Sequence, residues 1–387
     1  MKSKWEYIPF CDAVEIWDTL RKPINSKERS ARIEGKAESE LYPYYGATGQ
    51  VGLIDDYITD GEYVLLGEDG APFLNSFAQK AYLINGKTWV NNHAHVLRSK
   101  TNNRFLCYYL NYFNYKGYVS GTTRLKLTQA QMKTIPIPNP DADEQKRIVD
   151  KIEELFSQID DGVETLNKTK EQLKVYRQAV LCNAFKTLNN TIDMEKIATM
   201  LDPHPSHRTP PEVDGGTPYI GIGDIDYDAQ VINFDNARKV SMDVAKEHLE
   251  RYTLQEGDFV MGKIGTIGKP FKLPLPQNYT LSANVILIQP NLEFVMPEFL
   301  FWQFASPYIT QQLMQGATAT SQPAFGIKKA RKLQIKICNK KTQCEILNDI
   351  QAKMSICDNI EGTVNKAIIQ VDALRQSILK KAFEGEM

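Results

Sequence analysis

Cysteine is scarce in this chain, and long hydrophobic runs are absent from it. The six cysteines form no C-x-x-C pair and no close cluster, so reduced thiols in a cytosol are the simplest interpretation. No stretch approaches the roughly 18 apolar residues of a membrane-spanning helix, and the N-terminus lacks the apolar run of a signal peptide. We therefore expect a cytoplasmic protein that is neither secreted nor inserted in a membrane.

Net charge and histidine are also low, which removes several simple signs of function. The 46 basic and 47 acidic residues nearly cancel, so the overall charge does not indicate a nucleic-acid partner. The five histidines have no neighbouring set of cysteines or carboxylates, so we predict no metal site. The segment 262–270 resembles a phosphate-binding loop, but Lys263 and Pro270 stand where that loop needs glycine and serine or threonine.

The chain does contain an internal repeat. Residues 144–185 align without a gap with residues 342–383. Fourteen of the 42 pairs are identical, and these include Gln145/Gln343, Asp160/Asp358, Arg177/Arg375 and Phe185/Phe383. Such a match at a fixed shift indicates that one structural unit occurs twice.

Both copies of the repeat predict a long helix that needs a partner. They contain no proline, and apolar residues recur every seven positions, as in a coiled coil. Each helix would be roughly 60 Å long, and its narrow apolar seam is most simply buried by the other copy, in an antiparallel pair. The first stripe of the seam is Ile152, Ile159, Leu166, Leu173 and Val180, with Ile350, Cys357, Val364, Val371 and Ile378. The second stripe is Ile148, Leu155, Gly162, Thr169 and Tyr176, with their repeat partners.

The segment before each long helix predicts a globular head. The first head has strand-like runs separated by glycines, followed by an aromatic helix that starts after Asn102. The second head repeats this plan, with a helix from Pro297 to Phe304. Asp141 and Thr342 are the expected caps of the two long helices.

These elements predict a mixed α+β protein with pseudo-twofold internal symmetry. Two globules alternate with two long helices that form an antiparallel coiled coil. The predicted segments are a first head at 1–143, a first helix at 144–188, a second head at 189–341 and a second helix at 342–387.

Two similar but divergent heads on helices of fixed length suit an object with two separated sites, such as duplex DNA. In this respect the chain resembles the specificity subunit of a type I restriction-modification system. The resemblance rests on the duplicated helices, YPYYGATGQVG, the lead IPIPNPDADEQKRIVDKIEEL and the closing LRQSILKKAF. The lead into the second helix, LQIKICNKKTQCEIL, departs from the pattern because it lacks the prolines and the Glu-Gln pair.

The resemblance implies that each head is a target-recognition domain for one half of a bipartite double-stranded DNA sequence. It also implies two docked methyltransferase subunits that methylate adenine at N6, and motor-nuclease subunits that cleave DNA. S-adenosylmethionine, ATP and magnesium would bind to those partners and not to this chain. The chain has no (N/D)PP(Y/F) loop to hold a flipped base, so we expect a non-catalytic subunit.

Two groups of residues are candidates for DNA contact. Amide, imidazole and hydroxyl groups suit base edges, and the candidates are Asn91, Asn92, His93, Ser282 and Asn284. Basic residues and a glycine-rich loop suit phosphates, and the candidates are Arg124, Lys126, Lys263, Thr266, Lys269, Lys328, Lys329, Arg331 and Lys332. We expect Arg124 and Lys126 to match the basic run 327–341 of the second head. Structural hydrogen bonding and a solvated basic face are the alternatives.

Three other functions fit parts of the pattern. The first is the specificity chain of a restriction system whose partner fuses nuclease and methyltransferase. The second is a coiled-coil adaptor whose heads bind proteins, for which DNA binding would be absent or insensitive to salt. The third is an autonomous DNA enzyme, which the missing motifs disfavour.

Overall fold

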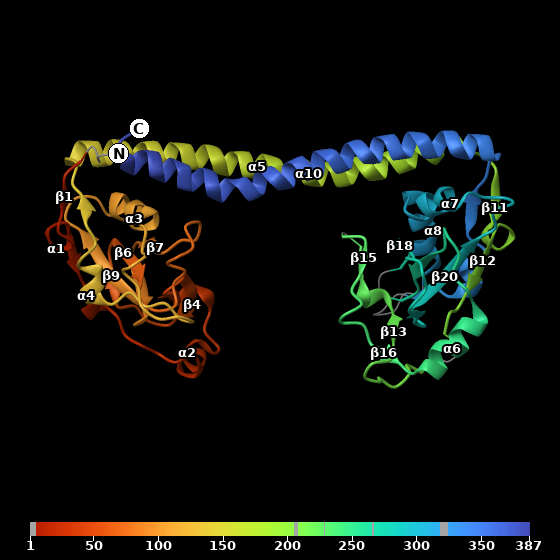
Figure 1. Cartoon of the computed structure of the whole chain (residues 1–387), viewed down its shortest axis with the longest axis horizontal. Helices are drawn as coiled ribbons and strands as arrows, with labels where there is room; N and C mark the ends of the chain where they lie inside the picture. The colour runs from red at the N-terminus through yellow and green to blue at the C-terminus, as the bar shows by residue number, and fades with distance from the viewer. Residues whose placement is uncertain (1–4, 205–207, 228, 265–266, 318–323) are drawn as a thin grey trace. The chain divides into compact units, whose positions relative to one another are not determined.

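The computed structural model describes residues 5–204, 208–227, 229–264, 267–317 and 324–387 (Figure 1). The chain forms two compact units. Unit 1 is built from Met1–Asn167 and Asn365–Met387, and unit 2 is Lys168–Val364. Each unit therefore combines one head with one part of each long helix.

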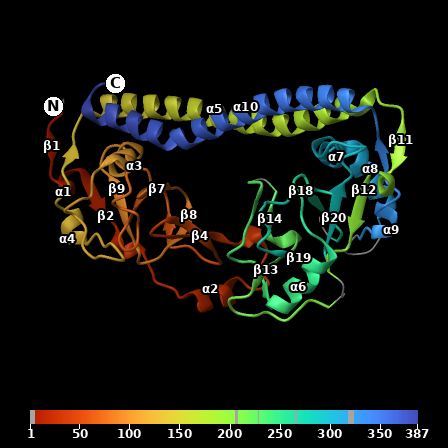
Figure 2. The ribbon, with the colours of Figure 1, turned by 45° about the vertical axis from the view of Figure 1, so that its right-hand side comes forward.

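The two long helices are α5 (Ala142–Lys186) and α10 (Lys340–Glu384), each of 45 residues. In unit 1 the start of α5 shares a core with the end of α10, through Ile148, Ile152, Leu379 and Phe383. In unit 2 the end of α5 shares a core with the start of α10. The helices lie side by side in both views (Figures 1 and 2). The predicted antiparallel pairing is therefore confirmed.

The seam between the helices differs from the sequence pattern in its second stripe. Tyr176 and Leu374 were expected inside it, yet their exposed fractions are 49% and 51%. The positions one residue later are buried or half-buried instead, and include Phe156, Arg177, Met354 and Arg375. The pattern failed here because long arginine side chains can cover apolar surface while their charged ends pair at its edge.

Both long helices begin two residues earlier than the sequence pattern predicted. The Asp141 carboxylate accepts a hydrogen bond from the Glu144 N–H at 2.8 Å and caps α5, as expected. The prediction that Thr342 caps α10 is wrong, because its N–H donates to the Asn339 side chain at 2.9 Å. Asn339 is the cap, and it is as good an N-cap residue as threonine or better.

The first head contains two four-stranded sheets. One sheet is antiparallel in the order β2-β9-β6-β7, and the other has the order β4-β3-β8-β5, with β3 and β8 parallel. The strands are β1 (Tyr7–Ile8), β2 (Val14–Ile16), β3 (Tyr42–Gly46), β4 (Gly49–Ile54), β5 (Thr59–Asp60), β6 (Tyr63–Gly67), β7 (Ala81–Ile84), β8 (Lys87–Val90), β9 (Ala94–Ser99) and β10 (Ile137–Pro138). The helices are α1 (Phe10–Ala13), α2 (Ser26–Ile33), α3 (Asn103–Tyr112) and α4 (Gln129–Met132).

The second head repeats this topology. The sheet β12-β20-β17-β18 corresponds to β2-β9-β6-β7, and the parallel pair β13-β19 corresponds to β3-β8. Its strands are β11 (Thr191–Asp193), β12 (Ala198–Leu201), β13 (Thr217–Ile220), β14 (Ile225–Asp226), β15 (Val231–Ile232), β16 (Lys239–Val240), β17 (Phe259–Gly262), β18 (Pro270–Lys272), β19 (Thr280–Leu281), β20 (Val285–Pro290) and β21 (Gln334–Lys336). Its helices are α6 (Met242–Arg251), α7 (Pro297–Phe304), α8 (Pro307–Gly316) and α9 (Ile327–Ala330).

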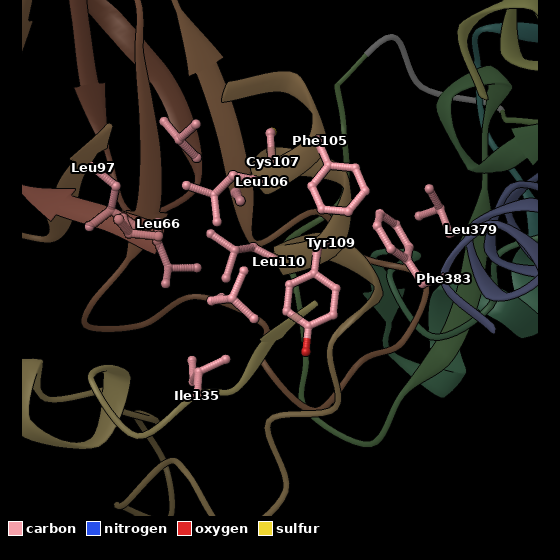
Figure 3. Close-up of a cluster of buried hydrophobic side chains, with 14 of the residues drawn as sticks. Leu66, Leu97, Phe105, Leu106, Cys107, Tyr109, Leu110, Ile135, Leu379 and Phe383 are labelled. Carbon is pink, nitrogen blue, oxygen red and sulfur yellow. The ribbon is translucent and has the colours of Figure 1, made fainter. Parts of the chain in front are cut away.

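The core of unit 1 joins the head to the long helices through aromatic rings (Figure 3). Phe383 of α10 lies against Phe105 and Tyr109 of α3, with ring centroids 5.3 and 5.4 Å apart. Its repeat partner Phe185 meets Phe299 of α7 in unit 2, at 5.4 Å. Burying a side chain of this size stabilises a fold by roughly 1.5–3 kcal/mol. The identical phenylalanines of the repeat are therefore anchors between helix and head.

Two buried glutamines of the repeat anchor the heads by hydrogen bonds. Gln145 donates to the Pro140 carbonyl at 3.0 Å and accepts from the Thr101 hydroxyl at 2.8 Å. Gln343 donates to the Cys338 carbonyl at 2.9 Å and accepts from the Met296 N–H at 2.8 Å. Each glutamine thereby ties the first turn of a long helix to its own head, since buried polar groups persist only when paired.

Candidate DNA interface

In the first head, four loops meet at one end of the strands and line an open hollow of ≈ 760 Å³. The predicted contact residues Asn91, His93 and Arg124 all line it, and Asn92 is an exposed neighbour. The other lining residues are Gly46, Ala47, Thr48, Val51, Asp69, Gly70, Ala71, Pro72, Thr123 and Leu125. Backbone hydrogen bonds hold the loops together, since the Asn91 N–H donates to Tyr45 and the Glu68 N–H donates to His93.

The basic side chains at and beside this hollow lie against acids that the sequence patterns did not single out. The Arg124 Nε lies 2.8 Å from a carboxylate oxygen of Asp69, and the His93 Nδ1 lies 3.7 Å from the other oxygen. The Lys126 ammonium lies 3.5 Å from Glu68. The sequence signal that could have identified these acids is the pair Glu68 and Asp69, directly after the predicted strand 62–67, because functional groups are common in loops.

A buried charge cluster lies beside these loops and ties them to the sheet. His95 is fully buried, with Nδ1 2.8 Å from Asp18 and Nε2 3.2 Å from the Leu127 carbonyl. Burial alone would raise the pKa of Asp18, but hydrogen bonds from His95, the Val96 N–H and Gln129 outweigh it and lower that pKa. The charged form of Asp18 is therefore part of the folded state.

The corresponding loop of the second head carries different side chains on the same frame. Strand pairing aligns Asn91 with Ser282 and His93 with Asn284. Ser282 is buried and hydrogen-bonds to the Asn284 side chain, which also accepts from the Ile222 N–H at 3.2 Å. In this structure Ser282 supports the loop, whereas Asn284 is partly exposed.

Gly221 is the close neighbour of this loop. A methyl group built at Gly221 would lie 2.8 Å from the Ser282 hydroxyl and 2.9 Å from the Asn284 side chain. Contacts this short are not tolerated without movement, so the loop geometry depends on glycine at this position.

A buried hydrogen-bonded chain supports the strand before the Ser282 loop. The His204 Nδ1 lies 2.8 Å from the His248 Nε2, and the His248 Nδ1 lies 2.5 Å from the Thr280 hydroxyl. The Tyr252 hydroxyl continues the chain to Thr280 at 3.1 Å. Burial, with smaller contributions from His204 and Arg251, lowers the pKa of His248 to about 4, although Glu247 opposes this.

The basic candidates of the second head are dispersed. Lys263 pairs with Asp202 at 2.6 Å, and Lys269 lies over the Tyr227 ring at 5.5 Å. Thr266 lies outside the described residues. In the basic run, Lys329 donates to the Gly316 carbonyl and Arg331 to the Met200 carbonyl. Lys332 binds Glu195 at 2.6 Å, and Lys328 is exposed.

The expected correspondence between the basic run and Arg124 with Lys126 is wrong. Lys126 forms a β-bridge with Asp69, and the equivalent bridge in the second head joins Ile264 and Ala324. Lys126 therefore matches Ala324, and the run 328–332 corresponds to residues around α4. The sequence comparison aligned the two loops in the wrong register, because backbone pairing and not residue similarity determines that register.

The chain thus has two heads of one topology, each with a loop cluster of divergent polar residues, joined by antiparallel helices. The family model described as "Type I restriction modification DNA specificity domain" matches residues 3–175 and 205–370. The chain belongs to this family and is the DNA-recognition subunit of a type I restriction-modification system.

Named relatives agree with this assignment. A putative type I restriction enzyme specificity subunit of Haemophilus influenzae is 27% identical over 308 residues, covering 77% of this chain and 76% of the relative. The EcoBI specificity subunit of Escherichia coli is 25% identical over 387 residues, covering 92% and 79%.

Solved structures share the fold. A chain from a study of complex assembly in the type I restriction-modification system superposes with a TM-score of 0.63 at 14% identity, with 100% of both chains covered. The HsdS subunit of Thermoanaerobacter tengcongensis superposes with a TM-score of 0.56 at 14% identity, covering 100% of this chain and 98% of that one. In the described part of the chain, no helix combines the length and apolarity needed to cross a membrane.

Proposed function

We propose that each head recognises one half of a bipartite DNA sequence and that the paired long helices set the spacer between the halves. The target-recognition domains are residues 1–143 and 189–341, and the spacer helices are 144–188 and 342–387. This proposal is carried by the observation that the two heads share one strand pairing but carry different side chains in the equivalent loop. Asn91 and His93 of the first head correspond to Ser282 and Asn284 of the second. One frame with different hydrogen-bonding groups suits two different half-sites.

The partners follow from the same duplication. Two methyltransferase subunits dock on the chain and methylate adenine at N6, and motor-nuclease subunits join them for cleavage. The number of two methyltransferase subunits is supported by the equivalent anchors between helix and head in the two units. These are Phe383 and Gln145 in unit 1, and Phe185 and Gln343 in unit 2. S-adenosylmethionine, ATP and magnesium bind to those partners, while this chain works in the cytoplasm without a cofactor or catalysis of its own.

The experiment is a genome-wide map of N6-methyladenine in cells that contain the methyltransferase subunit, with and without this chain. The expected result is a two-part methylated sequence that disappears when the chain is absent. An unchanged map with a demonstrably active methyltransferase would contradict the proposal and favour an adaptor whose heads bind proteins.

Exchange of one head tests whether each head recognises its own half-site independently. Residues 195–335 are replaced by the corresponding segment of a relative with another target. The expected map changes in one half of the sequence and keeps the other half and its spacer. A change in both halves would show that the heads do not act independently.

A further inference from the structure

The loop that carries Arg124 is rigidly mounted on the turn after β6. Ser120 and Lys126 exchange backbone hydrogen bonds at 3.0 and 2.8 Å, which closes the loop. The Gly70 N–H donates to the Leu125 carbonyl at 2.9 Å and fixes the loop against the neighbouring turn. Gly121 has φ +96°, and a methyl group there would lie 2.4 Å from the Arg124 carbonyl oxygen. The backbone position of Arg124 is therefore well determined.

The Arg124 side chain is oriented as well. Its Nε lies 2.8 Å from Asp69, and Gly70 packs against it so closely that a methyl group there would lie 3.2 Å from Nε. Among the described residues, Asp69 is the one acid at ion-pair distance from Arg124. Because Asp69 occupies the Nε edge, the two terminal nitrogens remain available at the hollow, and the side chain is 60% exposed.

The charge arrangement favours a base over a phosphate as the ligand of Arg124. A carboxylate beside a guanidinium reduces its attraction for a phosphate, since the negative charges repel. The same carboxylate fixes the direction of two N–H donors, which matters for the paired acceptors of a base edge. Guanine offers such a pair in the major groove, O6 and N7, and arginine is its commonest partner.

We propose that Arg124 is a specificity-determining residue of the first head, whose two terminal nitrogens donate N–H hydrogen bonds to O6 and N7 of a guanine in one half-site. Asp69 is its positioning residue. This inference rests on the proposed function and separates Arg124 from Lys126, with which the sequence pattern had grouped it as a phosphate contact. The second head has Ile264 at the position of Asp69, so an arginine oriented by this aspartate is proposed for the first head alone.

The test measures DNA binding by the complex of the full chain with its methyltransferase subunits. Each guanine of the methylated sequence is replaced in turn by 7-deazaguanine, which lacks the N7 acceptor. For the wild-type complex, one replacement in one half-site lowers the affinity by roughly 2- to 12-fold, about half the free energy of a good bidentate pair, because O6 remains. For Arg124→Ala, that replacement has no further effect.

Two further variants separate base recognition from charge and folding. Arg124→Lys keeps the positive charge but loses the planar pair of donors that Asp69 orients, so its sensitivity to that replacement falls without vanishing, because an ammonium still donates to N7 or O6. Asp69→Asn keeps the shape of the turn but releases Arg124, so discrimination falls while binding to unrelated DNA rises. The comparison is Lys126→Ala, which removes a neighbouring positive charge and keeps sensitivity to 7-deazaguanine.

Three results would overturn the inference. The first is that neither half-site contains a guanine, and the second is that the Arg124→Ala complex keeps full sensitivity to 7-deazaguanine. The third is that Arg124→Ala lowers the affinity equally for all DNA sequences and reduces the salt dependence of binding. A complex that binds DNA without any two-part preference would instead refute the proposed function. Discrimination at the other half-site serves as the control for folding of each variant.

Discussion

Arg177 of α5 binds Asp358 of α10, with Nη1 and Oδ1 2.8 Å apart, and the repeat partners of these residues make the same contact. Arg375 of α10 pairs with Asp160 of α5. The identical residues of the repeat therefore pair with each other across the helices, with the roles of α5 and α10 exchanged. An antiparallel pair of equivalent helices produces this crossed pattern, and the sequence identity at these positions acquires a structural reason.

The Arg177 pair should contribute measurably to the stability of unit 2. Arg177 also binds Glu361 at 2.8 Å and is only 24% exposed. Arg177→Ala should lower the free energy of unfolding by about 1 kcal/mol, somewhat more than Arg375→Ala, whose acidic contact in the described residues is Asp160. A double-mutant cycle with Asp358→Ala, followed by urea unfolding, measures the coupling. Additive single effects would show that the pair is not coupled.

A charge in the seam should disrupt the helix pair. Leu173 is 9% exposed, whereas Val175 on the same helix is 71% exposed. Leu173→Glu places a carboxylate in the apolar seam, where Arg177 already pairs with Asp358 and Glu361, and should lower stability by roughly 2–4 kcal/mol. Thermal unfolding and binding to the two-part sequence are measured. Val175→Glu is the matched control with little expected change, and equal effects of the two substitutions would refute the seam assignment.

Gly221 should be specifically required for the second recognition loop. Gly221→Ala forces the Ser282 hydroxyl and the Asn284 side chain to move, as the close contacts of a Cβ there require. Gly223→Ala is the matched control, because a methyl group at Gly223 meets no atom within 4 Å. We expect Gly221→Ala to weaken discrimination at one half-site and leave the other unchanged, as measured with single-base changes in the duplex. Discrimination retained by Gly221→Ala would contradict this role for the loop.

The buried histidine pair should make unit 2 sensitive to acid. The folded-state pKa of His248 is about 4, below its ordinary value of 6.5, so the unfolded chain binds more protons between these two values. Stability contributed by neutral His248 is therefore complete above pH 6.5 and falls as the pH decreases toward 4. His204, Glu247 and Arg251 are the titrating or charged neighbours that influence it.

Hydrogen exchange of β19 and α6 as a function of pH measures this effect. The wild-type chain should lose protection between pH 6.5 and 4. His248→Gln should show less protection at neutral pH but a flatter dependence, because the titrating ring is gone. An equally steep dependence in His248→Gln would assign the sensitivity to another group.

The repeated helices and the aromatic helices of the heads were predictable because their signals are local and periodic. A heptad pattern over more than forty residues specifies a helix whatever surrounds it, and the Asn102 cap specifies where α3 begins. The seam was less predictable. Arg177 and Arg375 take inner positions in place of the expected Tyr176 and Leu374, since a heptad pattern does not show that a charged side chain pairs with an acid on the other helix.

The candidate interface was only partly predictable for the same reason. The sequence by itself determined the duplication, the helix lengths and the polar loop that contains Asn91 and His93. Only the tertiary structure decided that Arg124 joins that loop at one hollow, that Asp69 orients it, and that the basic run 328–332 lies at another position. Contacts between segments tens of residues apart depend on strand pairing and loop register, which long-range packing selects and local composition does not encode.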